Sequence, residues 1–134
     1  MSEFLPPPLQ VEEVDADRWR LLTILSYNSD LLGRIHSVEA GTITDLESIP
    51  RLVPFAYAVA KGRAKRPAVI HDDLYQTPGF PKKMADDVFY EAMLSINLGH
   101  ALAWLMWLSV HWFGHPNYHR LQARALARLK EGAP

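Results

Sequence analysis

The stretch Val69–Gln76, with the sequence VIHDDLYQ, places a titratable base, two carboxylates and a phenol directly after two apolar residues. On an α-helix, His71 and Tyr75 are four positions apart and share a face, whereas Asp72 points about a quarter-turn away. His71 can therefore face one cavity while Asp72 reaches a neighbouring loop. The stretch predicts a helix whose two faces carry different polar chemistry.

A second carboxylate follows on the next predicted helix, which begins at Pro81 and carries Asp86. If this helix packs antiparallel on the first one, Asp86 lies beside His71. A histidine held by a buried aspartate has a fixed tautomer and a supported imidazolium, which is what a general base needs. Two alternatives stay open: the histidine is structural, or Asp86 faces solvent together with Asp87.

A third carboxylate lies upstream in the loop Thr44-Asp45-Leu46. Asp45 and Asp72, together with loop carbonyls such as that of Leu46, would make an all-oxygen site suited to a hard cation such as calcium. The spacing fits no EF-hand. The alternative is that Asp45 caps a helix, since aspartate is favoured at helix N-termini.

The elements around these residues predict an α+β fold that is mostly helical, with a small N-terminal antiparallel sheet and an antiparallel helix pair carrying the polar site. We expect one domain over residues 1–134, made of a proline-rich arm (1–13), strands (14–41), and a loop with helices (42–134). The strand formers of Trp19–Tyr27 and the alternation of Ile35–Glu39 indicate the strands. Proline, glycine and apolar spacing predict helices at 68–76, 81–97, 100–113 and 117–130, and the alanine-rich Leu52–Ala60 is also helical in character.

The composition excludes several classes of protein. Hydrophobic residues make up 49% and charged residues 22% of the 134 positions, which is typical of a globular domain. The net charge of −1 provides no electrostatic signature of a nucleic-acid partner. Because the chain has no cysteine, a disulfide framework and a thiol nucleophile are excluded.

The most apolar segment, Ala101–Val110, is shorter than the roughly 20 residues that a membrane-spanning helix needs. We therefore predict that the helix at 100–113 packs in the core or in an interface and does not span a bilayer. Trp104, Trp107 and Leu108 fall on one face of this helix. Attachment to a membrane surface through this tryptophan-rich helix is the weaker alternative.

Three blocks together resemble a known family: Thr44-Asp-Leu-Glu-Ser-Ile-Pro-Arg51, His71-Asp-Asp-Leu-Tyr75 and Ala85-Asp-Asp-Val-Phe89. The chain resembles, over residues 19–95, domain-of-unknown-function family 1353, whose members are mostly encoded by phages and prophages. That resemblance implies no settled activity.

The same blocks are more distantly similar to the active site of secreted phospholipase A2, especially bacterial and fungal forms. That similarity implies that His71 activates water, that Asp86 orients His71, and that Tyr75 braces the network. It also implies that Asp72 and the Asp45 loop hold calcium. The chain departs from that family because it lacks cysteines and a glycine-rich loop, and because its strands before residue 41 and its helix after residue 98 have no counterpart there.

Two functions follow as hypotheses. The first is a calcium-dependent hydrolase of a phospholipid ester, with a phospholipid or membrane surface as its partner. The second is a non-enzymatic phage protein, virion-associated or an assembly factor, in which the same residues form a structural polar network and other phage proteins are the partners. The start of the chain, MSEFLPPPLQVEE, is not a signal peptide, so the expected location is the host cytoplasm or the virion. The oligomeric state stays open.

Overall fold

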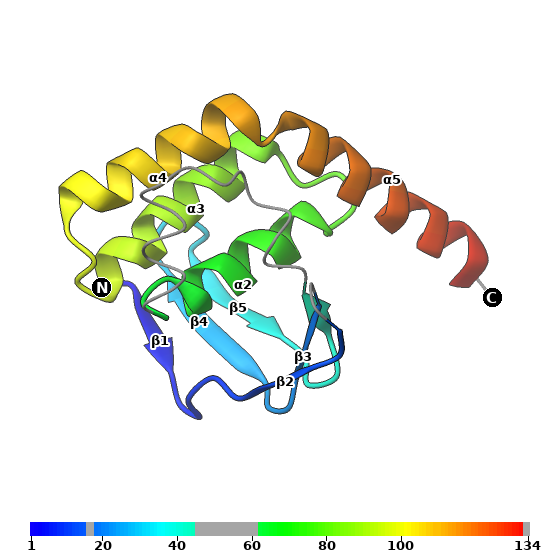
Figure 1. The fold of residues 1–134 in the computed structure, drawn as a ribbon, viewed down its shortest axis with the longest axis horizontal. Helices are drawn as coiled ribbons and strands as arrows, with labels where there is room; N and C mark the ends of the chain where they lie inside the picture. The colour runs from blue at the N-terminus through cyan, green and yellow to red at the C-terminus, as the bar shows by residue number, and fades with distance from the viewer. Residues whose placement is uncertain (16–17, 45–61, 133–134) are drawn as a thin grey trace.

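Two small antiparallel sheets and a group of helices make up the part of the chain that the computed structural model describes, which is residues 1–15, 18–44 and 62–132 (Figure 1). The strands are β1 (Glu3–Leu5), β2 (Val11–Glu13), β3 (Trp19–Leu21), β4 (Leu25–Ser29), β5 (Arg34–Val38) and β6 (Ile43–Thr44). The helices are α2 (Lys65–Tyr75), α3 (Lys82–Ser95), α4 (His100–Phe113) and α5 (His115–Gly132). The predicted α+β class is confirmed. The predicted helical segment at 52–60 lies outside the described residues.

The first sheet has the order β1-β4-β5. Its central strand, β4, forms a hairpin with β5. The register pairs Leu25 with Val38 and Ser29 with Arg34, and Gly33 allows the connecting turn because it adopts a positive φ of 67°. Alternate residues of β4 are buried, so one face of the hairpin is available for the helices.

The second sheet has the order β2-β3-β6. Residues 1–13, expected to form a proline-rich arm, contain two strands. Strand β1 pairs with β4 in the first sheet, and β2 pairs with β3 in the second. The three prolines, residues 6–8, fall between these two strands, where no ladder hydrogen bond is required. The arm is therefore a crossing between two sheets, and β6 extends the strand region beyond residue 41.

The helices begin and end close to the predicted positions. Helix α2 begins at Lys65, three residues before the predicted start, and Pro67 occupies its third position, within the first turn. A proline is tolerated there because the first helical N–H groups have no partner within the helix. Helix α5 begins directly after Gly114, so α4 and α5 follow one another along the edge of the molecule (Figure 1).

Helix α2 lies at the centre of the molecule, and most of its residues are buried. It contacts α3 and α5 as well as strands β5 and β6, while α3 contacts α4 on one side and β1 and β4 on the other. The sheets therefore cover one side of the α2–α3 pair, and α4 covers α3 from outside (Figure 1). This arrangement buries His71, Asp72 and Tyr75 together with the apolar residues of VIHDDLYQ, whereas Asp73 and Gln76 are half-buried.

Helix α4 packs through a different face from the tryptophan face noted in the sequence. Its buried residues are Ala103, Met106, Ser109 and Val110, whereas the side chain of Trp104 is 50% exposed. Small side chains on the buried face allow close packing of α4 on α3. Within the described residues, no helix combines the length and the apolar character that crossing a membrane requires.

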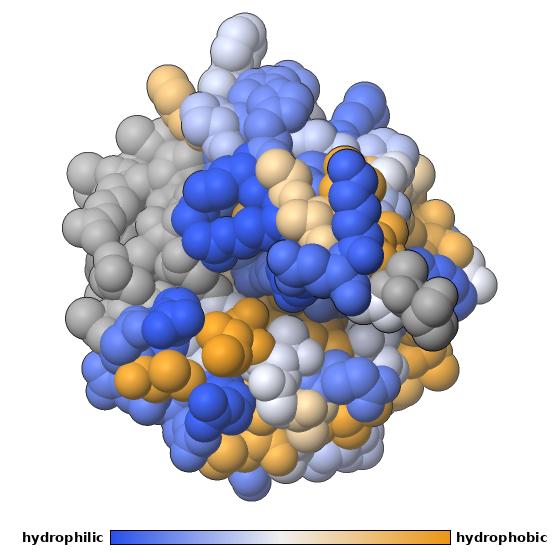
Figure 2. All heavy atoms as spheres, turned by 90° about the vertical axis from the view of Figure 1, so that its right-hand side faces the viewer, coloured by the Kyte–Doolittle hydropathy of each residue, from blue (hydrophilic) through white to orange (hydrophobic). Residues whose placement is uncertain are grey.

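The exposed surface carries separate apolar groups. Figure 2 looks toward the end of α5 and shows hydrophilic residues on the projecting helix, with hydrophobic residues in several distinct areas around it. On this face the apolar surface is divided by polar residues.

Candidate functional site

The site begins with a contact between α2 and α3. His71 Nε2 lies 2.8 Å from Asp86 Oδ1, and both side chains are 1% exposed. The prediction that these two residues lie within hydrogen-bond reach is confirmed. The alternative in which Asp86 faces solvent with Asp87 is wrong.

Asp86 accepts two further hydrogen bonds. The Tyr75 hydroxyl donates to Oδ1 over 2.6 Å, and the Lys82 ammonium donates to Oδ2 over 2.7 Å. Burial alone would raise the pKa of Asp86, but the hydrogen bond and charge of His71 and the hydrogen bonds from Lys82 and Tyr75 outweigh it and lower this pKa. Burial and the adjacent carboxylate raise the pKa of Tyr75. Asp86 is therefore ionised and Tyr75 is a neutral donor at neutral pH.

These charges determine the protonation of His71. Burial lowers the pKa of His71 below its ordinary value, and the Lys82 cation lowers it further, against the opposing effect of Asp86. A neutral imidazole beside an ionised carboxylate carries its proton on the nitrogen that faces the carboxylate, so Nε2 donates to Asp86. Nδ1 then presents a lone pair.

Nδ1 of His71 is buried and has no hydrogen-bond partner among the described residues. The ring is held by the rings of Tyr75 and Phe89, whose centroids lie 4.1 and 4.6 Å away. A buried basic nitrogen without a partner is uncommon, because such a group loses its hydration without compensation. It is the atom of this site that is available for a proton.

Lys82 belongs to the site and was missed by the sequence analysis. Besides Asp86, its ammonium donates to the carbonyl of Val110 over 2.8 Å and to that of His111 over 3.3 Å. Lys82 thus joins the His71–Asp86 pair to the C-terminal end of α4, where a cation is favourable. The signal was present, since Lys82 and Asp86 are four positions apart on one helix.

Asp72 faces a different neighbour from His71, as the helical spacing predicted. Its Oδ2 accepts hydrogen bonds from the Thr44 hydroxyl over 3.0 Å and from the Gln76 amide over 2.7 Å. Asp45 and Leu46, the other two predicted calcium ligands, lie outside the described residues. Over residues 1–15, 18–44 and 62–132, no three His, Asp or Glu side chains are grouped closely enough to hold a metal.

A second histidine–aspartate pair lies near the site and was not predicted. His36 Nε2 of β5 is 2.7 Å from Asp73 Oδ2 of α2, and Arg34 Nη1 lies 3.3 Å from His36 Nδ1. The pair joins α2 to the first sheet. No local pattern could indicate it, because its members are 37 residues apart.

The sequence was compared with families, with curated proteins and with solved structures. No curated protein and no solved structure matches the chain. The similarity to secreted phospholipase A2 therefore has no counterpart in these comparisons. One family profile matches residues 19–110, which is more than half of the 134 residues, and it is described as "Protein of unknown function (DUF1353)". This range contains β3 to β6, α2, α3 and most of α4, and with it His71, Tyr75, Lys82 and Asp86. The chain belongs to the DUF1353 family.

Proposed function

We propose that the protein is a hydrolase in which His71 activates a water molecule for attack on an ester, and that the ester belongs to a phospholipid. The proposal rests on Nδ1 of His71, which is buried and has no hydrogen-bond partner among the described residues. Nε2 of the same ring is held 2.8 Å from Asp86. The choice of a phospholipid ester rests on the similarity of the sequence blocks to secreted phospholipase A2.

The proton transfer follows from the charges of the site. Nδ1 accepts a proton from water while the water oxygen attacks the carbonyl carbon, and the resulting imidazolium is stabilised by ionised Asp86. The same proton then passes from Nδ1 to the oxygen of the leaving alcohol. Tyr75 and Lys82 keep Asp86 in place throughout, because each donates to one of its two oxygens.

Calcium is the proposed cation. Asp72 is a buried carboxylate whose Oδ2 is held by two donors, and hard cations favour such oxygens together with backbone carbonyls and water. Asp45 and the Leu46 carbonyl would complete the ligands, although both lie outside the described residues. When bound there, calcium would polarise the ester carbonyl and stabilise negative charge on its oxygen.

The experiment separates the base from the cation site. We expect calcium to raise the melting temperature of the wild type, and Asp72→Asn to weaken that shift because the ligand loses its formal charge. His71→Ala should keep the calcium shift and lose hydrolysis of a phospholipid ester. Asp73→Asn is the matched control, since Asp73 is adjacent in sequence but contacts His36. No calcium shift and no ester cleavage in the wild type would reject the proposal.

A second function is favoured by a different observation. Asp86 contacts His71, Tyr75 and Lys82, and Lys82 also contacts α4, so the network joins three helices. In a non-enzymatic assembly protein these contacts would serve stability alone. His71→Ala and Asp72→Asn would then each cost about 1–3 kcal/mol of folding free energy, and calcium would not change either melting curve.

A further inference from the structure

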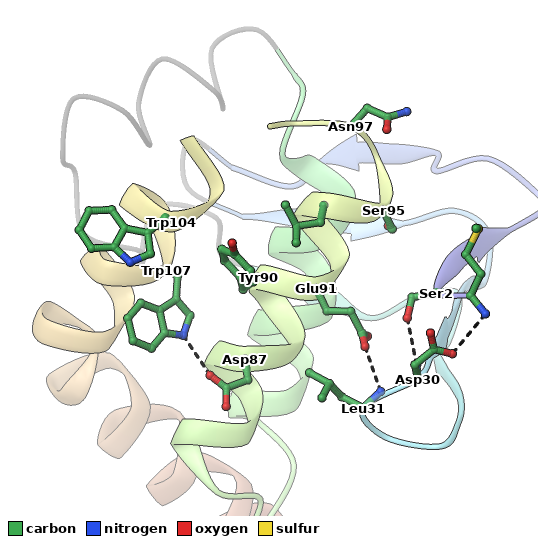
Figure 3. A pocket seen from close by; sticks show the side chains of 12 residues that line it. Ser2, Asp30, Leu31, Asp87, Tyr90, Glu91, Ser95, Asn97, Trp104 and Trp107 are labelled. Carbon is green, nitrogen blue, oxygen red and sulfur yellow. Dashed lines mark hydrogen bonds and ion pairs between the residues drawn. The ribbon is translucent and has the colours of Figure 1, made fainter. Parts of the chain in front are cut away.

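A cavity of about 840 Å³ lies on the outer side of α3, and neither His71 nor Asp86 lines it. Figure 3 shows that its walls include Tyr90 and Glu91 on α3, Trp104 and Trp107 on α4, and Leu31 in the turn after β4, together with the N-terminal end of the chain at Ser2. The cavity is therefore a site separate from the His71–Asp86 pair.

Three aromatic rings form one part of the wall. Trp104 and Trp107 stand on one side, with Tyr90 between them and Glu91 (Figure 3). Trp107 is fixed in position, because its Nε1 donates to Asp87 Oδ1 over 3.1 Å and its ring stacks on His111 at 4.8 Å. Faces of such rings attract cations through their quadrupole, and tryptophan does so most strongly.

The opposite part of the wall carries Glu91 and also Asp30, which pairs with the N-terminal ammonium of Met1 over 3.5 Å. Glu91 accepts hydrogen bonds from three neutral donors, which are the Tyr27 hydroxyl, the Ser29 hydroxyl and the Leu31 N–H, at 2.8, 2.7 and 2.9 Å. Among the described residues no cation pairs with Glu91, whereas Asp87 has Lys83 at 2.9 Å.

Aromatic faces and a carboxylate without a cation in the same cavity indicate that its ligand is positively charged. A small metal ion requires several oxygen ligands close together, and among the described residues no three His, Asp or Glu side chains are grouped closely enough to hold one. A quaternary ammonium group fits both features, since it is cationic, bears apolar methyl groups and requires no hydrogen bonds. We propose that this cavity binds an organic cation with a quaternary ammonium group. The proposal does not rest on the proposed hydrolysis.

The probe pair for the test is choline and 3,3-dimethylbutan-1-ol, which has the same shape without the charge. Titration of the full chain can be followed by tryptophan fluorescence, because two of the four tryptophans line the cavity. Choline should change the fluorescence in a saturable way, and the neutral alcohol should bind at least about tenfold more weakly. Equal binding of the two, or no binding of choline, would overturn the proposal.

Variants test the location. Trp104→Leu should weaken choline binding about fivefold or more, whereas Trp112→Leu should leave it unchanged. Trp112 is the matched control because it is on the same helix, is 65% exposed, and does not line the cavity. Glu91→Gln should also weaken binding, because it removes the charge that no cation of the described residues cancels while keeping an oxygen for the two hydroxyl donors. An equal loss in both tryptophan variants would place the ligand elsewhere and reject the site.

The source of the ammonium group is distinguished with vesicles. If vesicles of phosphatidylcholine bind and compete with free choline while vesicles of phosphatidylglycerol do not, the ligand is a lipid headgroup. If free choline binds and phosphatidylcholine vesicles do not compete, the ligand is a soluble ammonium compound. Both results support the cation site, and binding to phosphatidylglycerol vesicles alone would contradict it.

Discussion

In the proposed reaction, His71 would act as a base because of the residues around it and not because of its own pKa. Its pKa is lowered by burial, which by itself would make it a weak base. Ionised Asp86 offsets this penalty when the imidazole gains a proton. The proton-accepting atom is thereby Nδ1, and its basicity depends on Asp86 and Lys82 of α3.

The lowered pKa of His71 predicts a loss of stability in acid. In the unfolded chain the imidazole takes up a proton near its ordinary pKa of 6.5, whereas in the folded chain it does so at lower pH. Stability therefore falls as the pH falls from about 6.5 toward the folded pKa, with a slope of at most about 1.4 kcal/mol per pH unit. Melting temperatures between pH 8 and pH 5 with a calcium chelator would measure this.

The matched variant for that measurement is His71→Gln, which cannot titrate. Its melting temperature should decrease less with acidification than that of the wild type, and the difference between the two curves isolates His71 from the other histidines. Parallel curves would contradict the prediction. Asp86 also has a lowered pKa. The stability that ionised Asp86 contributes is therefore lost only when the pH falls below the ordinary aspartate pKa of 3.8.

Two neighbouring lysines form one buried and one exposed ion pair, which allows their contributions to stability to be compared. Lys82 pairs with buried Asp86, and its side chain is 11% exposed, whereas Lys83 pairs with Asp87 and is 79% exposed. Lys82→Met should cost about 3 kcal/mol, because Asp86 keeps a buried charge without its cation. Lys83→Met should change stability by less than about 1 kcal/mol. Urea unfolding of both variants would test this, and equal losses would contradict it.

At the scale of elements, the junction of α4 and α5 approaches the site closely. A Cβ atom added at Gly114 would lie 2.4 Å from the carbonyl oxygen of Val110 and 3.0 Å from the hydroxyl of Tyr75. Gly114→Ala should therefore displace the end of α4 and cost about 1–3 kcal/mol. Gly132→Ala is the control, because nothing lies within 4 Å of its added Cβ. Thermal unfolding compares the two, and an unaffected Gly114→Ala variant would contradict the packing.

Elements with local sequence signals could be predicted, whereas elements that depend on distant contacts could not. Helices α2 and α3 have local start and stop residues, and helical spacing is enough to place Tyr75 beside His71. The face on which α4 packs could not be predicted, because apolar residues occur on all of its sides. Strand β1 was missed because its partner β4 is distant in sequence, and the same holds for the His36–Asp73 pair. Strand β2 pairs with nearby β3, but at three residues it is too short for an alternating pattern to stand out.

For the whole molecule, the matched family range ends at residue 110, before α5. Helix α5 nevertheless completes the packing around α2. The Gln122 side chain donates to the carbonyls of Tyr75 and Thr77 at 2.8 Å and accepts from the Gly79 N–H at 2.9 Å. These bonds satisfy backbone groups at the end of α2 that have no further helical partner.

Truncation tests where the folding unit ends. Leu121 and Ala125 are buried, whereas Leu129 is 56% exposed, and the end of α5 runs away from the other helices in Figure 1. A chain ending at Arg128 should keep its stability within about 0.5 kcal/mol. A chain ending at Phe113 loses the burial of Leu121 and the three bonds of Gln122, so it should lose at least about 3 kcal/mol. If both chains unfold like the full one in urea, α5 adds nothing to stability, and the contribution expected from Leu121 and Gln122 is wrong. If the longer one is also destabilised, the exposed last turn makes contacts that the structure does not contain.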